Sequence, residues 1–140
     1  MFQKVLHGFS ERSYALLRIV AGLMWSFHGM QKTFHFNLPP EHIPKTWSQM
    51  WFGGLIELTC GLLIALGLFA SPAAFLASGT MAVAYIQFHW NFQFDRNFIP
   101  GINGGEPALL YSFLFLFIAC RGAGVWSVDS KRAKRSEMPA

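Results

Sequence analysis

The sequence predicts an all-α integral membrane protein, a bundle of four transmembrane helices with both termini on the cytoplasmic side. Three observations lead to this prediction: 53% of the 140 residues are hydrophobic, 13% are charged, and the apolar residues gather in four segments. Each span through a hydrocarbon core of about 30 Å takes roughly 20 apolar residues, so four spans would use most of the chain. The mean hydropathy of +0.34 is also too high for a typical small soluble domain.

The four apolar segments lie at about residues 13–34, 51–69, 72–90 and 107–121. The first segment has no small-residue cleavage site of the A-x-A type, so we expect it to be retained as a span. Only Ala70, Ser71 and Pro72 connect the second and third segments, which predicts a tight hairpin with Pro72 in the first turn of the third helix. The fourth segment is the shortest, and we expect Trp126 to extend its helix by a turn to the membrane interface.

Lysine and arginine residues are distributed unevenly between the two ends of the predicted bundle. On the side of the termini lie Lys4, Arg12, Arg18, Arg121, Lys131, Arg132, Lys134 and Arg135. On the side of the two long loops, at about 37–49 and 91–106, lie Lys32, Lys45 and Arg96. Because Lys and Arg accumulate on the cytoplasmic side, we expect cytoplasmic termini in a bacterial inner membrane. Residues 1–130 would form the membrane domain and residues 131–140 a basic cytoplasmic tail.

Composition and motifs exclude several classes of function. The net charge of +4 does not indicate nucleic-acid binding, because no basic surface is interleaved with aromatic residues; membrane lipid is the expected partner of the tail. Cys60 and Cys120 belong to no C-x-x-C or Cys/His pattern, so we predict no metal site and two buried cysteines. His28 and His89 could ligate a haem but lack a C-x-x-C-H context. Without a nucleotide, zinc-protease or serine-hydrolase motif, we predict no intrinsic cofactor and leave open whether the chain is an enzyme.

Polar side chains interrupt the apolar segments at one level of the predicted bundle. Because a charge at membrane depth needs a partner, a water-filled cavity or a route to the surface, such residues are candidates for function. Titratable groups that converge in a cleft indicate a functional site. The six residues of this outer layer are His28, Lys32, Glu57, Gln87, His89 and Glu106.

Glu57 is the strongest candidate of this layer. It lies about six residues, or ~9 Å, inside the second helix, and its side chain is too short to reach water easily. We expect an ion pair with Lys32, and His28 lies one turn from Lys32 on the same helix face. Lys32 could instead be an interface lysine whose chain reaches the surface, and His89 could be an interface residue.

Glu106 has a second possible role, and two residues outside the outer layer, Asn103 and Arg18, are further candidates. Glu106 precedes Pro107, which is typical of a helix start with an acid beside the positive end of the helix dipole. Asn103 opens a glycine turn, where missing side chains would let a ligand approach the backbone. Arg18 lies near the inner end of the first helix, and we expect it to reach the cytoplasmic headgroups.

Short motifs occur in a fixed order along the four segments. They are Leu16-Leu17-Arg18-Ile19, His28-Gly29-Met30-Gln31-Lys32, Phe52-Gly53-Gly54-Leu55-Ile56-Glu57, Asn103-Gly104-Gly105-Glu106 and Trp126-Ser127-Val128-Asp129. In these motifs the sequence resembles the DoxX family of small bacterial membrane proteins over about residues 13–130. The resemblance implies a four-helix membrane domain related to the small membrane subunit of thiosulfate:quinone oxidoreductases, with redox or sulfur-metabolism enzyme subunits as partners. The polar motif positions that it carries over are Arg18, His28, Lys32, Glu57, Asn103 and Glu106.

Three hypotheses for function follow. The first is an accessory or quinone-interacting subunit of a membrane redox system, in which His28, Lys32 and Glu57 bind carbonyl oxygens and move protons. Redox chemistry would then belong to a partner or to a bound quinone. The second is a binding or transport module for a small molecule, which in so narrow a bundle would require a homo-oligomer. The third is a scaffold that anchors soluble enzymes through the basic tail.

Overall fold

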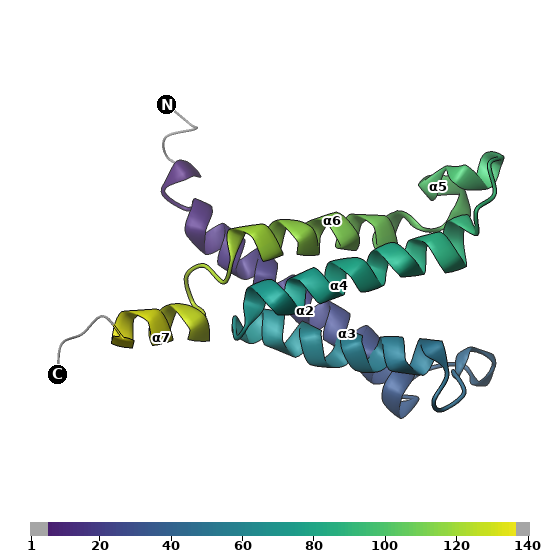
Figure 1. Cartoon of the computed structure of the whole chain (residues 1–140), viewed down its shortest axis with the longest axis horizontal. Coiled ribbons are helices and arrows are strands. Elements are labelled where there is room, and N and C mark those ends of the chain that lie inside the picture. The colour runs from purple at the N-terminus through teal and green to yellow at the C-terminus, as the bar shows by residue number, and fades with distance from the viewer. Residues whose placement is uncertain (1–5, 137–140) are drawn as a thin grey trace.

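Four long helices form the body of the molecule (Figure 1). The computed structural model describes residues 6–136, and no strand occurs among them. The long helices are α2 (Ser10–Phe34), α3 (Gln49–Leu66), α4 (Ala70–Ala84) and α6 (Glu106–Arg121). A π-helical segment, η2 (Tyr85–Trp90), continues α4 without a break. The predicted all-α fold is confirmed, and each predicted segment coincides with one helix to within a few residues.

The two ends of the molecule differ in what they contain. The start of α2, the α3–α4 turn, the end of α6 and a short helix, α7 (Val128–Ser136), lie at one end, which we call the terminal end (Figure 1). The connections 35–48 and 91–105 lie at the other end, the loop end. These loops contain η1 (Pro40–His42), η3 (Arg96–Phe98) and α5 (Pro100–Asn103).

Local sequence signals explain where α3 begins and ends and where α4 begins. Ser48 caps α3, and its side-chain oxygen accepts a hydrogen bond from the Trp51 N–H at 3.2 Å. Gly67, with a φ of 66°, ends α3 in the left-handed conformation that glycine adopts without a steric penalty. The next helix begins at Ala70, so that Pro72 lies in its first turn. The predicted tight hairpin is confirmed.

The chain after α6 departs from the prediction. α6 ends at Arg121, and Gly122 follows with a φ of 84°, which breaks the helix. Trp126 therefore lies outside α6, and its expected role in extending that helix was wrong. A separate helix, α7, starts at Val128 and crosses the boundary placed between residues 130 and 131. Residues 137–140 of the predicted tail, and Lys4, lie outside the described residues.

Glycines let α2 and α3 pack backbone against backbone. A Cβ atom on Gly22 would lie 2.6 Å from the Gly61 carbonyl oxygen, and one on Gly29 would lie 2.5 Å from the Gly54 carbonyl oxygen. Each helix thus places two glycines seven residues apart, on the face that meets the other helix. Such close approach is typical of helix pairs in membranes. α3 then packs on α4, and α4 packs on α6.

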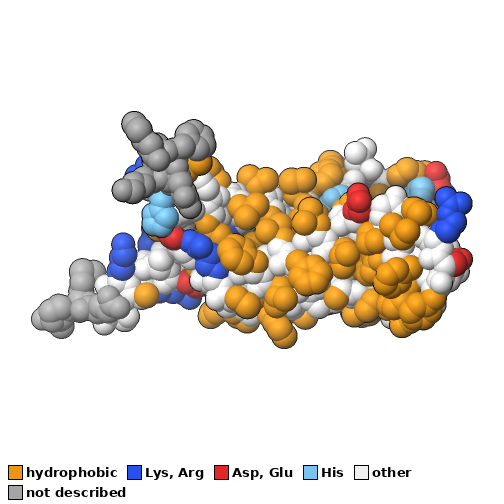
Figure 2. Space-filling model, turned by 90° about the horizontal axis from the view of Figure 1, so that it is seen from above, with side chains coloured by type: hydrophobic (Ala, Val, Ile, Leu, Met, Phe, Trp, Pro, Cys, Tyr) orange, Lys and Arg blue, Asp and Glu red, His pale blue; other side chains and the backbone are white. Residues whose placement is uncertain are grey.

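The interior is rich in small and polar residues, whereas the surface is apolar. Alanine and glycine fill much of the buried core, with Arg18 and Glu57 among them, whereas Leu23, Phe75 and Leu110 are at least half exposed. Hydrophobic side chains cover the middle of the face seen in Figure 2, and charged side chains lie toward its ends. Cys60 is buried as expected, but Cys120 is exposed on α6, so the expectation for Cys120 was wrong.

One helix among residues 6–136, α3, combines the length and apolarity that a membrane crossing requires, with a mean hydropathy of 1.5 over 18 residues. α4 and α6 have 15 and 16 residues. α2 has 25 residues but carries Arg18, His28 and Lys32.

Candidate functional site

Lys32 and Glu57 form an ion pair near the loop end of the bundle. Lys32 Nζ lies 2.6 Å from Glu57 Oε1, as the sequence predicted. Gly29 of α2 and Gly54 of α3 lie where the two backbones are in contact. Lys32 comes one helical turn after Gly29, and Glu57 comes one helical turn after Gly54. The close approach of the two backbones is what brings the side chains within hydrogen-bond distance.

The carboxylate of Glu57 is buried, but only one of its two oxygens accepts a hydrogen bond. The Glu57 side chain is 6% exposed and the Lys32 side chain 33% exposed. Glu57 Oε1 accepts the bond from Lys32, while Oε2 has no hydrogen-bond partner among the described residues. A buried carboxylate oxygen is stabilised by a donor and destabilised without one. This oxygen therefore has an unmet capacity to accept a hydrogen bond.

A cavity of about 210 Å³, which we call the central cavity, surrounds the pair. All four helices of the body, together with η2 and the glycine turn, contribute to its wall. The lining residues are Trp25, His28, Lys32, Glu57, Met81, His89, Gly104, Pro107, Ala108 and Tyr111. The Trp25 indole N–H points to Met81 Sδ at 3.1 Å, which fixes one wall.

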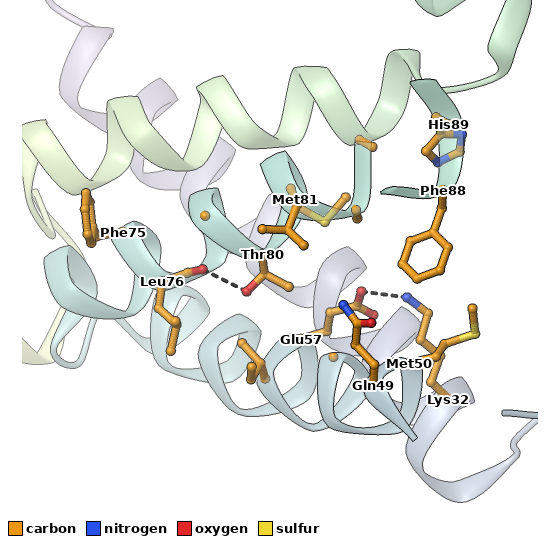
Figure 3. A pocket seen from close by; sticks show the side chains of 16 residues that line it. Lys32, Gln49, Met50, Glu57, Phe75, Leu76, Thr80, Met81, Phe88 and His89 are labelled. Carbon is orange, nitrogen blue, oxygen red and sulfur yellow. Dashed lines mark hydrogen bonds and ion pairs between the residues drawn. The ribbon is translucent and has the colours of Figure 1, made fainter. Parts of the chain in front are cut away.

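A longer groove between α3 and α4, the α3–α4 groove, reaches the same residues from the surface. Its volume is about 620 Å³, and Lys32, Glu57 and His89 line it as well as the central cavity. Figure 3 shows the polar side chains of Lys32 and Glu57 toward one end of the groove, and Phe75 toward the other. The groove thus has a polar head and an apolar body.

The structure brings four of the predicted residues together around the central cavity: His28, Lys32, Glu57 and His89. His28 is exposed on α2. His89 is partly buried on η2, and its Nδ1 lies 3.3 Å from the Asn103 carbonyl oxygen. A carbonyl oxygen only accepts, so this contact requires the Nδ1–H tautomer, in which Nε2 of the neutral ring is left to accept from a ligand.

The other candidates of the loop end do not line the central cavity. Gln87 is exposed and accepts a hydrogen bond from Gln49 at 2.6 Å. Asn103 organises its own loop, since its amide donates to the Asn97 carbonyl at 2.7 Å and accepts from the Gly105 N–H at 2.7 Å. Glu106 lines a different groove, between α2 and α6, which we call the α2–α6 groove. From their depth along the helices, these residues were predicted to share one layer with Glu57. In the structure they face in different directions around the bundle.

Arg18 is fully buried and does not reach the surface, so its expected contact with headgroups was wrong. Its Nη1 donates to the carbonyl oxygens of Ile64 at 2.5 Å and Ala65 at 2.7 Å. Its Nη2 donates to the carbonyl oxygen of Trp126 at 2.9 Å. Both carbonyls belong to the last turn of α3, where the Gly67 N–H bonds Ile64 at 3.1 Å and no following turn of helix bonds Ala65. Arg18 therefore joins the end of α3 to the segment after α6.

Several residues of this arrangement were not among the predicted site residues. Trp25 shares one face of α2 with His28 and Lys32, and this spacing of three and four residues was a readable signal. Tyr111 lies between the central cavity and the α2–α6 groove, with no comparable signal in the sequence. At the terminal end, both carboxylate oxygens of Asp129 accept from the N–H groups of Phe69 and Ala70, each at 3.0 Å.

Comparison with known proteins identifies the family of the chain. The family model described as DoxX matches residues 13–90, which contain most of α2, all of α3, α4 and η2, and six of the ten residues that line the central cavity. An uncharacterised protein of Haemophilus influenzae is 38% identical over 123 residues, which are 86% of this chain and 91% of that protein. No solved structure matches the chain. With more than half of its length matched and a relative of this similarity, the chain belongs to the DoxX family.

Proposed function

We propose that the protein crosses a bacterial inner membrane four times, with both termini in the cytoplasm, and binds a quinone as an accessory subunit of a membrane redox system. The observation that carries the ligand proposal is the second carboxylate oxygen of Glu57, which is buried and has no partner among the described residues. A molecule that donates a hydrogen bond to this oxygen would remove the penalty for leaving it unpaired.

The distribution of side chains supports the membrane part of the proposal. A folded domain in water rarely exposes apolar patches larger than a few hundred Å², yet large hydrophobic side chains are exposed along α2, α4 and α6. The exposed cations Arg12, Arg121 and Lys131 lie at the terminal end, where positive charge marks the cytoplasmic side. An apolar middle with charged ends is the surface that a bilayer requires.

The head of the α3–α4 groove has the chemistry that a quinone needs. The Lys32 ammonium can donate a hydrogen bond to a quinone carbonyl, and Glu57 Oε2 can accept one from a quinol hydroxyl. Because the opposite charges of Lys32 and Glu57 cancel, the site favours a neutral head over an anion. Reduction of the quinone takes two electrons and two protons. The electrons would come from a redox partner, and Glu57, His28 and His89 would exchange the protons with the loop end.

Quinone extraction tests this proposal. The protein purified from native membranes should carry about one quinone per chain, and the isosteric Glu57→Gln variant should lose it. Glu106→Gln is the matched control, because it makes the same change to a carboxylate that faces the α2–α6 groove. A wild-type protein without quinone would disprove the proposal. So would a loss caused by Glu106→Gln and not by Glu57→Gln.

Cysteine labelling tests the topology. In a Cys60→Ala/Cys120→Ala background, an impermeant maleimide should label Glu41→Cys in intact spheroplasts, since Glu41 is exposed in the first loop. It should label Ser136→Cys, which is exposed on α7, only after the membrane is permeabilised. The reverse pattern would place the loop end in the cytoplasm, and labelling of both sites in intact spheroplasts would rule out the four-span arrangement.

One observation favours a second function, as a scaffold for a soluble enzyme. α7 presents Lys131, Arg132, Lys134 and Arg135 on an exposed helix, and Asp129 ties its start to the α3–α4 turn. A chain cut after residue 130 keeps the contacts of Asp129 and Arg18. It should therefore stay folded and release a co-purifying enzyme, and retention of that enzyme would exclude this role.

A further inference from the structure

Two glycines of the α3–α4 groove have no packing role. Gly53 on α3 and Gly79 on α4 both line the groove, and a Cβ atom built on either would meet nothing within 4 Å. Glycine inside a helix is destabilising by about 1 kcal/mol relative to alanine. At Gly22 and Gly29 the close approach of two helices offsets this penalty. At Gly53 and Gly79 no helix packs closely, and the missing side chains leave open space in the groove.

The open space lies along a groove that changes in character along its length. Lys32 and Glu57 lie toward one end, and Phe75 and Leu76 lie toward the other (Figure 3). The Thr80 hydroxyl between them donates to the Leu76 carbonyl of its own helix at 2.9 Å. The body of the groove therefore offers apolar contact, while the polar groups are concentrated at the head.

We propose that the α3–α4 groove holds the hydrocarbon tail of the bound quinone, and that Gly53 and Gly79 keep the groove wide enough for it. This inference rests on the proposed function, in which Lys32 and Glu57 bind the head. The groove volume of about 620 Å³ lies within the range of about 300–1,000 Å³ of pockets that bury most of a ligand. The groove is open to the surface, so a tail enters sideways from the bilayer while the head reaches the central cavity.

The charges of Lys32 and Glu57, at the polar end of the groove, favour a quinone over a phospholipid as the bound molecule. A phospholipid could also place an acyl chain in the groove, and its phosphate would be attracted by Lys32. However, Lys32 is already neutralised by Glu57 at 2.6 Å, and the carboxylate would repel an anionic phosphate. A neutral head with carbonyl or hydroxyl oxygens meets no such repulsion, so a tailed quinone fits the groove better than an anionic lipid does.

The test compares two quinones with the same head, one with a decyl tail and one without a tail. Binding is measured at equilibrium with the full chain in nanodiscs. Gly79→Leu should weaken binding of the tailed quinone by about tenfold, the equivalent of 1.4 kcal/mol. Binding of the tail-less quinone should change by less than about twofold, because the head site is untouched. Thr80→Leu adds bulk to the body of the same groove and should act in the same way, which keeps the test valid if one variant does not fold.

Two controls isolate the groove. Leu116→Phe adds bulk to an exposed position of α6 that does not line the α3–α4 groove, and it should leave both affinities unchanged. Anionic phosphatidylglycerol should fail to displace the tailed quinone.

Each outcome decides between the two proposals. If the wild-type protein binds neither quinone, the proposed function is wrong and the tail site with it. If the wild-type protein binds both and the leucine variants bind the tailed quinone as well as the wild type does, only the tail site is wrong. Loss of both quinones in the variants, or displacement by phosphatidylglycerol, would also overturn the tail site.

Discussion

Arg18 and Glu57 are both buried charges, one near each end of the bundle, but their surroundings differ. Arg18, at the terminal end, donates to carbonyl oxygens of Ile64, Ala65 and Trp126. Glu57, toward the loop end, uses one oxygen for Lys32 and leaves the other without a partner among the described residues. Burial of a charge is unfavourable at both places, so the partners decide what each charge contributes.

This difference suggests two roles. Arg18 is an architectural charge, which stabilises the fold, and Glu57 is a binding charge, which interacts with a ligand. Two of the carbonyls that Arg18 bonds, those of Ala65 and Trp126, have no other donor among the described residues, whereas that of Ile64 also accepts from the Gly67 N–H. Asp129 strengthens the same end, because it accepts from the N–H groups at the start of α4. Among the described residues, no donor bonds the second carboxylate oxygen of Glu57. We therefore expect substitutions at the terminal end to change stability, and substitutions at Glu57 to change binding.

Arg18→Met should have the largest effect on stability. Each buried carbonyl left without a donor costs about 1–3 kcal/mol, and those of Ala65 and Trp126 lose theirs. The free energy of unfolding should therefore fall by about 2 kcal/mol or more. Thermal unfolding of the purified protein in detergent measures this change. Arg12→Met is the matched control, because Arg12 lies on the same helix with an exposed side chain, and it should change stability by less than about 0.5 kcal/mol. Equal effects of the two substitutions would contradict the role assigned to Arg18.

The sequence was sufficient to predict the helices and one contact between them. Hydropathy located the four segments, and Pro72 after so short a connection indicated the hairpin that the structure contains. Lys32 and Glu57 could be paired from their depth alone, because the first helix ends and the second begins at the same level. Depth is read directly from residue number at about 1.5 Å per residue, which explains this success.

Rotation of each helix about its axis could not be read in the same way. A segment that is apolar on all sides gives no amphipathic pattern to show which face turns inward. Glu106 was therefore grouped with Glu57, although it faces the α2–α6 groove, and Arg18 was directed to the surface, although it is buried. Gly22 and Gly29 define the inward face of α2, yet only their contact with α3 distinguishes them from an open glycine such as Gly53.

Gly29→Ala should have an intermediate effect, because it disturbs the contact that positions the binding charge. The new methyl group would collide with the Gly54 carbonyl oxygen and the Leu58 backbone nitrogen of α3. Such overpacking should destabilise the protein by about 1–3 kcal/mol and move Lys32 away from Glu57. Gly53→Ala places the same methyl group in open space, so it should be neutral or stabilise by up to about 1 kcal/mol. Unfolding measurements on both variants give the comparison, and a Gly29→Ala variant as stable as Gly53→Ala would show that α2 and α3 can separate to accommodate the methyl group.

Glu57→Gln should have the smallest effect on the stability of the ligand-free protein. Glutamine keeps the size of the side chain and an oxygen for Lys32, and Lys32 is exposed enough to be hydrated. Loss of a partly exposed ion pair costs about 0–1 kcal/mol, and removing a buried charge offsets part of that cost. The decisive measurement is the unfolding temperature with and without added tailed quinone. A ligand stabilises the state that binds it, so quinone should raise the unfolding temperature of the wild-type protein and of Arg12→Met, but not of Glu57→Gln. If ligand-free Glu57→Gln instead lost as much stability as Arg18→Met, Glu57 would be an architectural charge like Arg18, and its unpaired oxygen would no longer argue for a ligand.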